Sequence, residues 1–187
     1  MIIALAGRRV DPLGAETPRF SLDQVGVVRN RLRSLFQSVG ATTLVASGAC
    51  GADLLAMQAA GELGLRRRMV IPFDPPVFRE KSVVDRPGEW GPIFDQIASE
   101  LAAAGDLIVL GEPGDSDAAY ARTNAAMIAE AVRLAREIGR EPNLGILVVV
   151  VWDGQPRDST DLTADFASKA RALGLAVREV STRADAP

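Results

Sequence analysis

The sequence contains no histidine, and this absence excludes several classes of enzyme and metal site at once. Without histidine there is no Ser-His-Asp or Cys-His catalysis, no imidazole general base and no histidine-ligated metal. The single cysteine excludes an internal disulfide, and no cysteine cluster indicates zinc. Any chemistry would rest on Asp, Glu, Arg, Lys, Tyr or water, and we predict no metal site and no required cofactor.

A basic excess is also missing, and aromatic residues are few. Lys and Arg total 21 against 24 Asp and Glu, the formal net charge is −3, and aromatic residues make up 5% of the chain. Proteins that bind nucleic acid or anionic membranes generally carry a basic excess, and single strands stack on aromatic side chains. We therefore expect no nucleic-acid partner and no membrane partner, so any phosphate contact must be local.

Long hydrophobic runs are absent as well. The longest strongly apolar run, 144–152, is about half of the ~20 residues that a membrane helix requires. The apolar residues 1–6 are too few for a signal-peptide core, and the first arginines follow them. We expect a cytoplasmic protein whose residues 1–187 form one domain, because this length and a hydrophobic fraction of 48% suit a single core.

Short apolar runs alternate with longer segments of helical period, most of which end at glycine. The predicted strands cover 1–6, 42–46, 68–71, 106–110, 145–152 and 176–180, and the predicted helices cover 25–39, 52–63, 93–101, 117–138 and 162–173. A Ser21/Gln24 capping box precedes the first helix. Parallel neighbours need such crossovers, so we predict an α/β fold: a Rossmann-like, doubly wound, mostly parallel sheet of about six strands with helices on both faces.

In sheets of this kind, ligands bind at the carboxyl ends of the strands, where the strand order reverses. The loops after the first, second and fifth strands should therefore converge on one crevice. The irregular segment 73–91, rich in proline and charge, leaves room for one or two helical turns at 78–84 and is expected to line or cover something.

The loop after the second strand reads Ser47-Gly48-Ala49-Cys50-Gly51-Ala52-Asp53 and runs directly into a helix. Small residues let a ligand approach the backbone, and the first N–H groups of a helix attract anions, so this loop is a candidate phosphate-binding loop. The alternative is a plain tight turn whose glycines serve packing alone. Asp53 is expected to order the loop by accepting backbone hydrogen bonds, although it could instead accept hydrogen bonds from a ribose or a base.

The other two loops offer charged and hydroxyl groups. Gly7, Arg8 and Arg9 follow the first strand, where a guanidinium would suit a phosphate or carboxylate, or would simply be solvated. The loop after the fifth strand contributes Asp153, Gly154, Ser159 and Thr160, which could contact a second phosphate or a ribose oxygen. Ordinary helix capping by Asp158 or Ser159 is the alternative reading of that loop.

These three loops together resemble the SLOG superfamily, which includes the lonely-guy phosphoribohydrolases and the Smf/DprA-type DNA-processing proteins. The small stand-alone members are similar in Gly7-Arg8, in the turn from Ser47 to Asp53, in Trp152-Asp153-Gly154 and, imperfectly, in Asp158-Ser159-Thr160. The resemblance implies a Rossmann-like domain that binds a nucleotide or a nucleotide derivative such as AMP or ADP-ribose. It also implies a homo-oligomer, since oligomerisation is common in that family.

The enzymatic branch of the family carries Pro-Gly-Gly-x-Gly-Thr-x-x-Glu, in which the glutamate acts on the N-glycosidic bond. Thr160 matches the threonine, but Thr163 stands at the position of the glutamate and Asp158-Ser159 replaces the two glycines. We therefore predict no catalytic residue and a ligand sensor with little or no catalysis. The alternative is a nucleoside 5′-monophosphate phosphoribohydrolase in which Asp161, Asp165 or Glu80 replaces the glutamate. Handling of single-stranded DNA is a weaker third reading.

Overall fold

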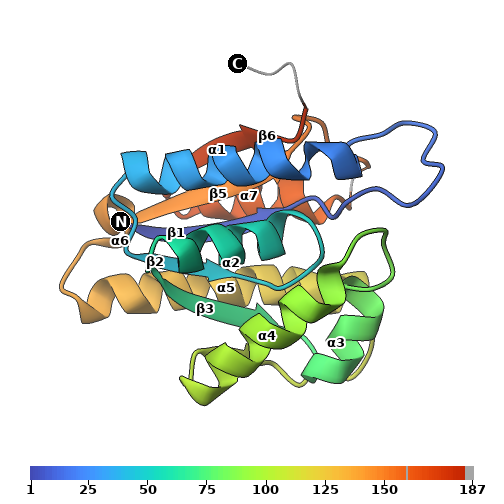
Figure 1. The fold of residues 1–187 in the computed structure, drawn as a ribbon. Helices are drawn as coiled ribbons and strands as arrows, with labels where there is room; N and C mark the ends of the chain where they lie inside the picture. The colour runs from blue at the N-terminus through green and yellow to red at the C-terminus, as the bar shows by residue number, and fades with distance from the viewer. Residues whose placement is uncertain (159, 184–187) are drawn as a thin grey trace.

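A computed structural model describes residues 1–158 and 160–183 of the chain. Its strands are β1 (Ile2–Gly7), β2 (Thr43–Ala46), β3 (Arg66–Ile71), β4 (Leu107–Val109), β5 (Ile146–Trp152) and β6 (Ala176–Ser181). Within these residues they form one six-stranded, all-parallel sheet in the order β4-β3-β2-β1-β5-β6 (Figure 1). The predicted fold class is confirmed, and each predicted strand lies within a few residues of an observed one.

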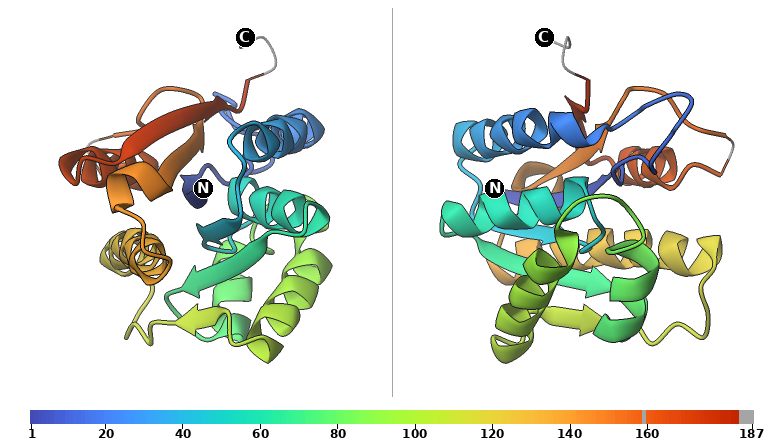
Figure 2. Two further views of the ribbon diagram at one scale, coloured as in Figure 1. Left: turned by 90° about the vertical axis from the view of Figure 1, so that its left-hand side faces the viewer. Right: turned by 45° about the vertical axis from the view of Figure 1, so that its right-hand side comes forward.

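Helices cover both faces of the sheet. The helical elements are η1 (Leu22–Gln24), α1 (Val25–Ser38), α2 (Ala52–Glu62), α3 (Pro75–Ser82), α4 (Trp90–Ala103), α5 (Asp117–Glu137), α6 (Pro142–Gly145) and α7 (Leu162–Ala172). One core packs α1, α2 and α4 against the sheet, and a second core packs α5 and α7 against its other face (Figure 2, left). The β1 side chains alternate between the cores, with Ile3 and Leu5 in the first and Ile2 and Ala4 in the second.

Two local expectations need correction. The chain before α1 forms the 3₁₀ turn η1, and the Ser21 hydroxyl donates to the Asp23 carboxylate at 2.5 Å instead of capping a helix. The one or two helical turns expected at 78–84 in segment 73–91 are α3, which begins earlier, at Pro75, because proline suits a first-turn position that needs no backbone donor.

The strand order reverses between β1 and β5. The chain moves outward from β1 through β2 and β3 to β4, and then returns to place β5 on the other side of β1. The carboxyl ends of β2, β1 and β5 are therefore neighbours, on the right-hand side of Figure 1.

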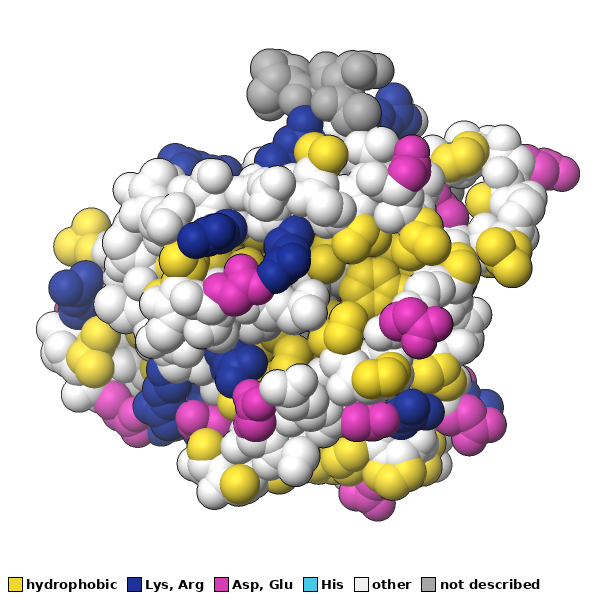
Figure 3. Space-filling view, viewed as in Figure 1, with side chains coloured by type: hydrophobic (Ala, Val, Ile, Leu, Met, Phe, Trp, Pro, Cys, Tyr) yellow, Lys and Arg dark blue, Asp and Glu magenta, His cyan; other side chains and the backbone are white. Residues whose placement is uncertain are grey.

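The surface over α1, α2 and α4 mixes charges of both signs. Figure 3 shows Lys and Arg interspersed with Asp and Glu on this face. Among residues 1–158 and 160–183, no helix has the length and apolar character needed to cross a membrane.

Candidate functional site

A cavity of about 660 Å³ opens at the carboxyl ends of β1, β2 and β5. Its walls come from the loop after β1, the loop after β2, the end of α3, the start of α5 and the chain leading into α7. The three loops predicted to converge do so. The expectation for segment 73–91 is also confirmed, since Phe78, Lys81, Ser82 and Arg86 line this cavity.

The glycines of the first two loops lie where chain segments pack against one another. A Cβ on Gly51 would lie 2.8 Å from the carbonyl oxygen of Arg8, and its φ of +94° favours glycine. A Cβ on Gly7 would lie 2.5 Å from the Cβ of Ala52, and one on Gly48 would lie 3.0 Å from the Met69 side chain. The contacts at Gly7 and Gly51, which involve backbone and Cβ atoms, account for glycine at these two positions without reference to a ligand, whereas the flexible Met69 side chain near Gly48 can move aside.

Several backbone N–H groups around the start of α2 already have protein acceptors. Ala52 donates to the carbonyl of Arg8 at 3.1 Å, and Cys50 donates to the carbonyl of Ser82 at 3.0 Å. These bonds attach the loop after β2 to the loop after β1 and to the end of α3. The turn is therefore a junction of three segments as well as the start of a helix.

Asp53 lies in the first turn of α2, is 7% exposed and lines the cavity. Its Oδ1 atom has no hydrogen-bond partner among the described residues. Burial raises the pKa of Asp53 to about 7, against the opposing effects of the backbone N–H groups of Ala49 and Gly7 and of the Arg9 charge. A carboxyl group in this setting changes its charge near neutral pH.

Arg8 is held inside the protein. Its Nη1 donates to Asp161 Oδ2 at 2.5 Å, its Nε to Asp153 Oδ1 at 3.4 Å and its Nη2 to the carbonyl of Gln155 at 2.6 Å. The guanidinium also lies 5.8 Å from the centre of the Trp152 ring. Arg8 thus joins the loop after β1 to the loop after β5 at the point where the strand order reverses.

The helix cap of α7 is Asp161, whereas the sequence suggested Asp158 or Ser159. Asp161 Oδ1 accepts from the N–H groups of Thr163 and Ala164, which are the free donors of the first turn. Asp158 instead accepts from the N–H and hydroxyl of Thr160, both at 2.7 Å. The difference arises because adjacent polar residues compete for one capping position, and the tertiary pairing with Arg8 selects Asp161.

The structure brings some of the predicted site residues together and leaves others outside the cavity wall. Those that line it are Gly7, Arg8, Arg9, Ser47, Ala49 and Asp53. Those that do not line it are Gly48, Gly51, Ala52, Asp153, Gly154 and Thr160. Ser159 lies outside the described residues. The role of each in ligand binding stays a prediction.

A basic cluster on the cavity wall was not predicted. It consists of Arg9, Lys81, Arg86 and the carboxylate of Asp85. Arg9 pairs with Asp85 at 2.7 Å and donates to the carbonyl of Lys81 at 3.3 Å, while Arg86 pairs with Asp85 at 3.3 Å. Among the described residues, the Lys81 ammonium has no ion-pair partner. Two arginines thus share one carboxylate, and a lysine without an ion-pair partner among the described residues lines the same cavity, in a chain whose net charge is negative.

The start of α5 supplies polar groups that sequence reasoning also missed. Tyr120 donates to Asp115 at 2.9 Å, and its oxygen lies 3.1 Å from the hydroxyl of Ser82 on α3. Burial raises the pKa of the Tyr120 phenol. The signal that could have found these residues is topological, because α5 follows β4 and begins at the same edge of the sheet.

No protein-family model matches the sequence, and no curated protein matches it. Two solved structures resemble the fold at low similarity. DNA processing protein A (DprA) from Streptococcus pneumoniae gives a TM-score of 0.42 at 16% identity, over 94% of this chain and 57% of that chain. The Moco carrier protein from Chlamydomonas reinhardtii gives 0.34 at 18% identity, over 97% and 90%. Neither likeness bears on a ligand or a reaction, and the SLOG assignment stays a prediction.

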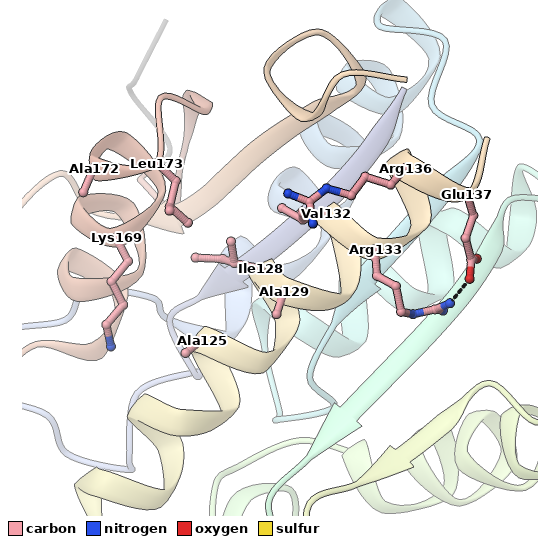
Figure 4. A pocket seen from close by; sticks show the side chains of 10 residues that line it. All are labelled: Ala125, Ile128, Ala129, Val132, Arg133, Arg136, Glu137, Lys169, Ala172 and Leu173. Atoms are coloured by element: carbon pink, nitrogen blue, oxygen red, sulfur yellow. Dashed lines mark hydrogen bonds and ion pairs between the residues drawn. The ribbon is translucent and has the colours of Figure 1, made fainter. Parts of the chain in front are cut away.

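A second hollow, of about 870 Å³, lies between α5 and α7 and away from the cavity just described (Figure 4). Ile128, Val132 and Leu173 line it with apolar surface, and an ion pair joins Arg133 to Glu137 at its edge. Its walls are helix surface rather than loops at strand ends. Nothing in the structure shows what covers it, and the predicted homo-oligomer stays a prediction.

Proposed function

We propose that this chain binds a nucleotide or a nucleotide derivative of the AMP or ADP-ribose type in the cavity at the carboxyl ends of β1, β2 and β5. The volume of about 660 Å³ falls within the range of roughly 300–1,000 Å³ found for small-molecule sites. Its place beside the reversal of strand order is where open α/β sheets bind ligands.

The observation that carries the proposal is the basic cluster on the cavity wall. Phosphate oxygens accept charge-assisted hydrogen bonds from guanidinium and ammonium groups. Lys81 contributes a cation with no carboxylate partner among the described residues, beside Arg9 and Arg86, which share Asp85. We therefore place the phosphate at this cluster, with the turn around Gly51 as the adjoining wall.

Arg8 has a different task in this proposal. Because its guanidinium already contacts Asp153, Asp161 and the Gln155 carbonyl, it positions the loops that enclose the ligand. Gly154 and Thr160, in the loop after β5, are proposed to close the far side over the sugar or a second phosphate.

We propose binding without hydrolysis. Asp161, one of the carboxylates that could replace the family glutamate, is committed to Arg8 and to capping α7. Asp165 pairs with Lys169 at 2.6 Å. Neither Asp165 nor Glu80 is among the described residues that line the cavity. Together with Thr163 at the glutamate position, these placements favour a sensor.

Isothermal titration with AMP and ADP-ribose tests the proposal. We expect saturable binding that weakens as salt is raised, and an affinity about tenfold lower in Lys81→Ala, because a hydrogen bond to a charged group contributes about 1.5 kcal/mol or more. Arg79→Ala is the matched control, since Arg79 lies on the same helix, pairs with Asp95 at the surface and does not line the cavity. No heat of binding at millimolar ligand, or equal losses in the two variants, would refute it.

A further inference from the structure

Asp53 is the one feature of the cavity that a phosphate does not explain. Its side chain is buried, it lines the cavity, and Oδ1 is without a hydrogen-bond partner among the described residues. Buried polar atoms are almost always hydrogen-bonded, and leaving one unpaired costs roughly 1–3 kcal/mol. The backbone N–H groups of Ala49 and Gly7 act on the same carboxyl group, so a donor that arrives with the ligand would supply the partner that Oδ1 lacks.

The partner of a carboxylate oxygen must be a hydrogen-bond donor. A second anion would be repelled, and the repulsion is stronger in a partly buried site than in water. The basic cluster of Arg9, Lys81, Arg86 and Asp85 already offers the cavity a place for an anion. The cavity thus has a cationic wall for phosphate and, at Asp53, a separate acceptor for a neutral donor.

The other charged and titratable groups around Asp53 do not change the assignment of phosphate to the basic cluster and of a neutral donor to Asp53. Arg9 is the only one whose charge shifts the pKa of Asp53 in the described structure. Cys50, from the loop after β2, is a neutral thiol because burial raises its pKa to about 12. The remaining groups on the cavity wall are Lys81 and Arg86 from the α3 side, Asp115, Asp117 and Tyr120 from the start of α5, Arg157 ahead of α7, and Arg8, Asp11, Glu16 and Arg19 after β1.

We propose that Asp53 accepts a hydrogen bond from a neutral donor of the bound nucleotide, either a ribose hydroxyl or the amino group of the base, and so orients the nucleoside away from the basic cluster. The inference rests on the proposed function and assigns the two ends of the ligand within that cavity. Asp53 acts here as a binding residue, and no bond is made or broken.

A pH titration of affinity distinguishes this arrangement from a phosphate beside Asp53. The accepting form is the carboxylate, and the pKa of Asp53 in the free protein is about 7. If only that form binds, affinity rises about tenfold between about pH 6 and pH 8, following the fraction of competent protein. ADP-ribose is the probe, because its pyrophosphate keeps its charge over this range whereas the phosphate of AMP titrates near pH 6.

The expected result is a rise in ADP-ribose affinity with pH in the wild type and a flat profile in Asp53→Asn. Thermal melting of the variant shows that it is folded. An affinity that is flat or falls with pH in the wild type would overturn the assignment of Asp53 while leaving nucleotide binding intact. Absence of binding at every pH would instead overturn the proposed function, and the inference with it.

Ligand analogues identify the donor. At about pH 8, loss of the ribose hydroxyls in 2′-deoxy-AMP or 3′-deoxy-AMP, or loss of the amino group in IMP, should weaken binding to the wild type about fivefold or more, as expected for one hydrogen bond of about 1 kcal/mol. The same analogue should match AMP in Asp53→Ala, which offers no acceptor. Equal affinities of all four ligands for the wild type would contradict the proposal.

Discussion

Arg8 Nη1 lies 2.5 Å from Asp161 Oδ2, although 153 positions of sequence separate the two residues. Their side chains are 3% and 0% exposed, so the pair is closed off from solvent. It joins the carboxyl end of β1 to the N-terminus of α7, the helix that follows β5, and the strand order reverses between β1 and β5. One ion pair therefore fixes the spacing of two cavity walls.

Replacing Arg8 should be costly because its partners would remain buried and charged. We expect Arg8→Met to lower the free energy of unfolding by about 3–5 kcal/mol, the range for breaking a buried ion pair on one side. Arg29→Met is the control. Arg29 also pairs with a distant carboxylate, Glu62, but both side chains are about 40% exposed, and the loss should stay below about 1 kcal/mol. Urea unfolding of both variants measures this, and similar losses would contradict the assignment.

The lowered pKa of Asp161 predicts that the folded protein loses stability in acid. Burial opposes its ionisation, but the N–H of Arg157, the Arg8 guanidinium and the N–H of Ala164 outweigh that effect and hold the pKa at about 2. Because the folded pKa lies below the unfolded value of 3.8, the stabilisation is complete above about pH 4 and disappears as the pH falls toward 2. The stabilisation from this lowered pKa amounts to roughly 2 kcal/mol.

The difference in unfolding free energy between the wild type and Asp161→Asn isolates this contribution from other carboxylates. It should shrink by about that amount between pH 5 and pH 2 in urea titrations. A difference that stays constant over that range would count against the depressed pKa.

The raised pKa of Asp53 predicts the opposite dependence of stability on pH. Its folded pKa of about 7 lies above the unfolded value of 3.8, so the protonated form favours folding. The wild type therefore loses stability as the pH rises from about 4 to 7, and the loss is complete above 7. The Asp53→Asn side chain cannot ionise, so the free energy of unfolding of this variant relative to the wild type should increase by up to roughly 4 kcal/mol between pH 4 and pH 8. Chemical denaturation at the two pH values measures the change. If the free energies of unfolding of the two proteins change equally with pH, the raised pKa of Asp53 is contradicted.

The order of strands and helices could be predicted because each signal is local. The run 145–152 is almost entirely β-branched and apolar, and β5 indeed spans Ile146–Trp152 with every residue buried. The crevice followed from the general rule that ligands in such sheets bind at the carboxyl ends of the strands, although the order of the strands in the sheet was not predicted. The limits of α3 were harder to predict, because prolines and charges obscure the helical period of segment 73–91.

The roles of individual site residues could not be predicted from local sequence. Arg8 and Arg9 are adjacent, yet Arg8 is buried between Asp153 and Asp161 while Arg9 reaches Asp85 at the surface of the cavity. Only the distant partners distinguish them, and these partners come from the tertiary path of the chain. Segment 73–91 was expected to line or cover something, but its sequence did not single out Lys81 from its other charged residues, and only the tertiary path places Lys81 on the cavity wall.

No release of base is expected from AMP. Thr163 stands where the phosphoribohydrolases carry the glutamate that acts on the N-glycosidic bond, so the carboxylate that would stabilise the developing positive charge on the sugar is missing from that position. Long incubation at high protein concentration, with free adenine measured by chromatography, should match the buffer control. Adenine release that disappears in Asp53→Asn would instead reveal hydrolysis that depends on Asp53.

Gly51 provides the sharpest test of how the loops pack. Its φ of +94° already disfavours alanine, and a Cβ there would lie 2.8 Å from both the Arg8 carbonyl oxygen and the Val10 nitrogen, so backbone must move. We expect Gly51→Ala to lower the free energy of unfolding by about 3 kcal/mol or more, from roughly 1–2 for the conformation and the rest for overpacking.

Gly64→Ala is the matched control, because Gly64 has a φ of +68° with no atom within 4 Å of the added Cβ, and it should lower the free energy of unfolding by only about 1 kcal/mol. Urea midpoints of the two variants measure the difference. Equal costs would mean that the close approach of the loops after β1 and β2 does not require glycine, and that the residue at 51 is free to serve a ligand instead.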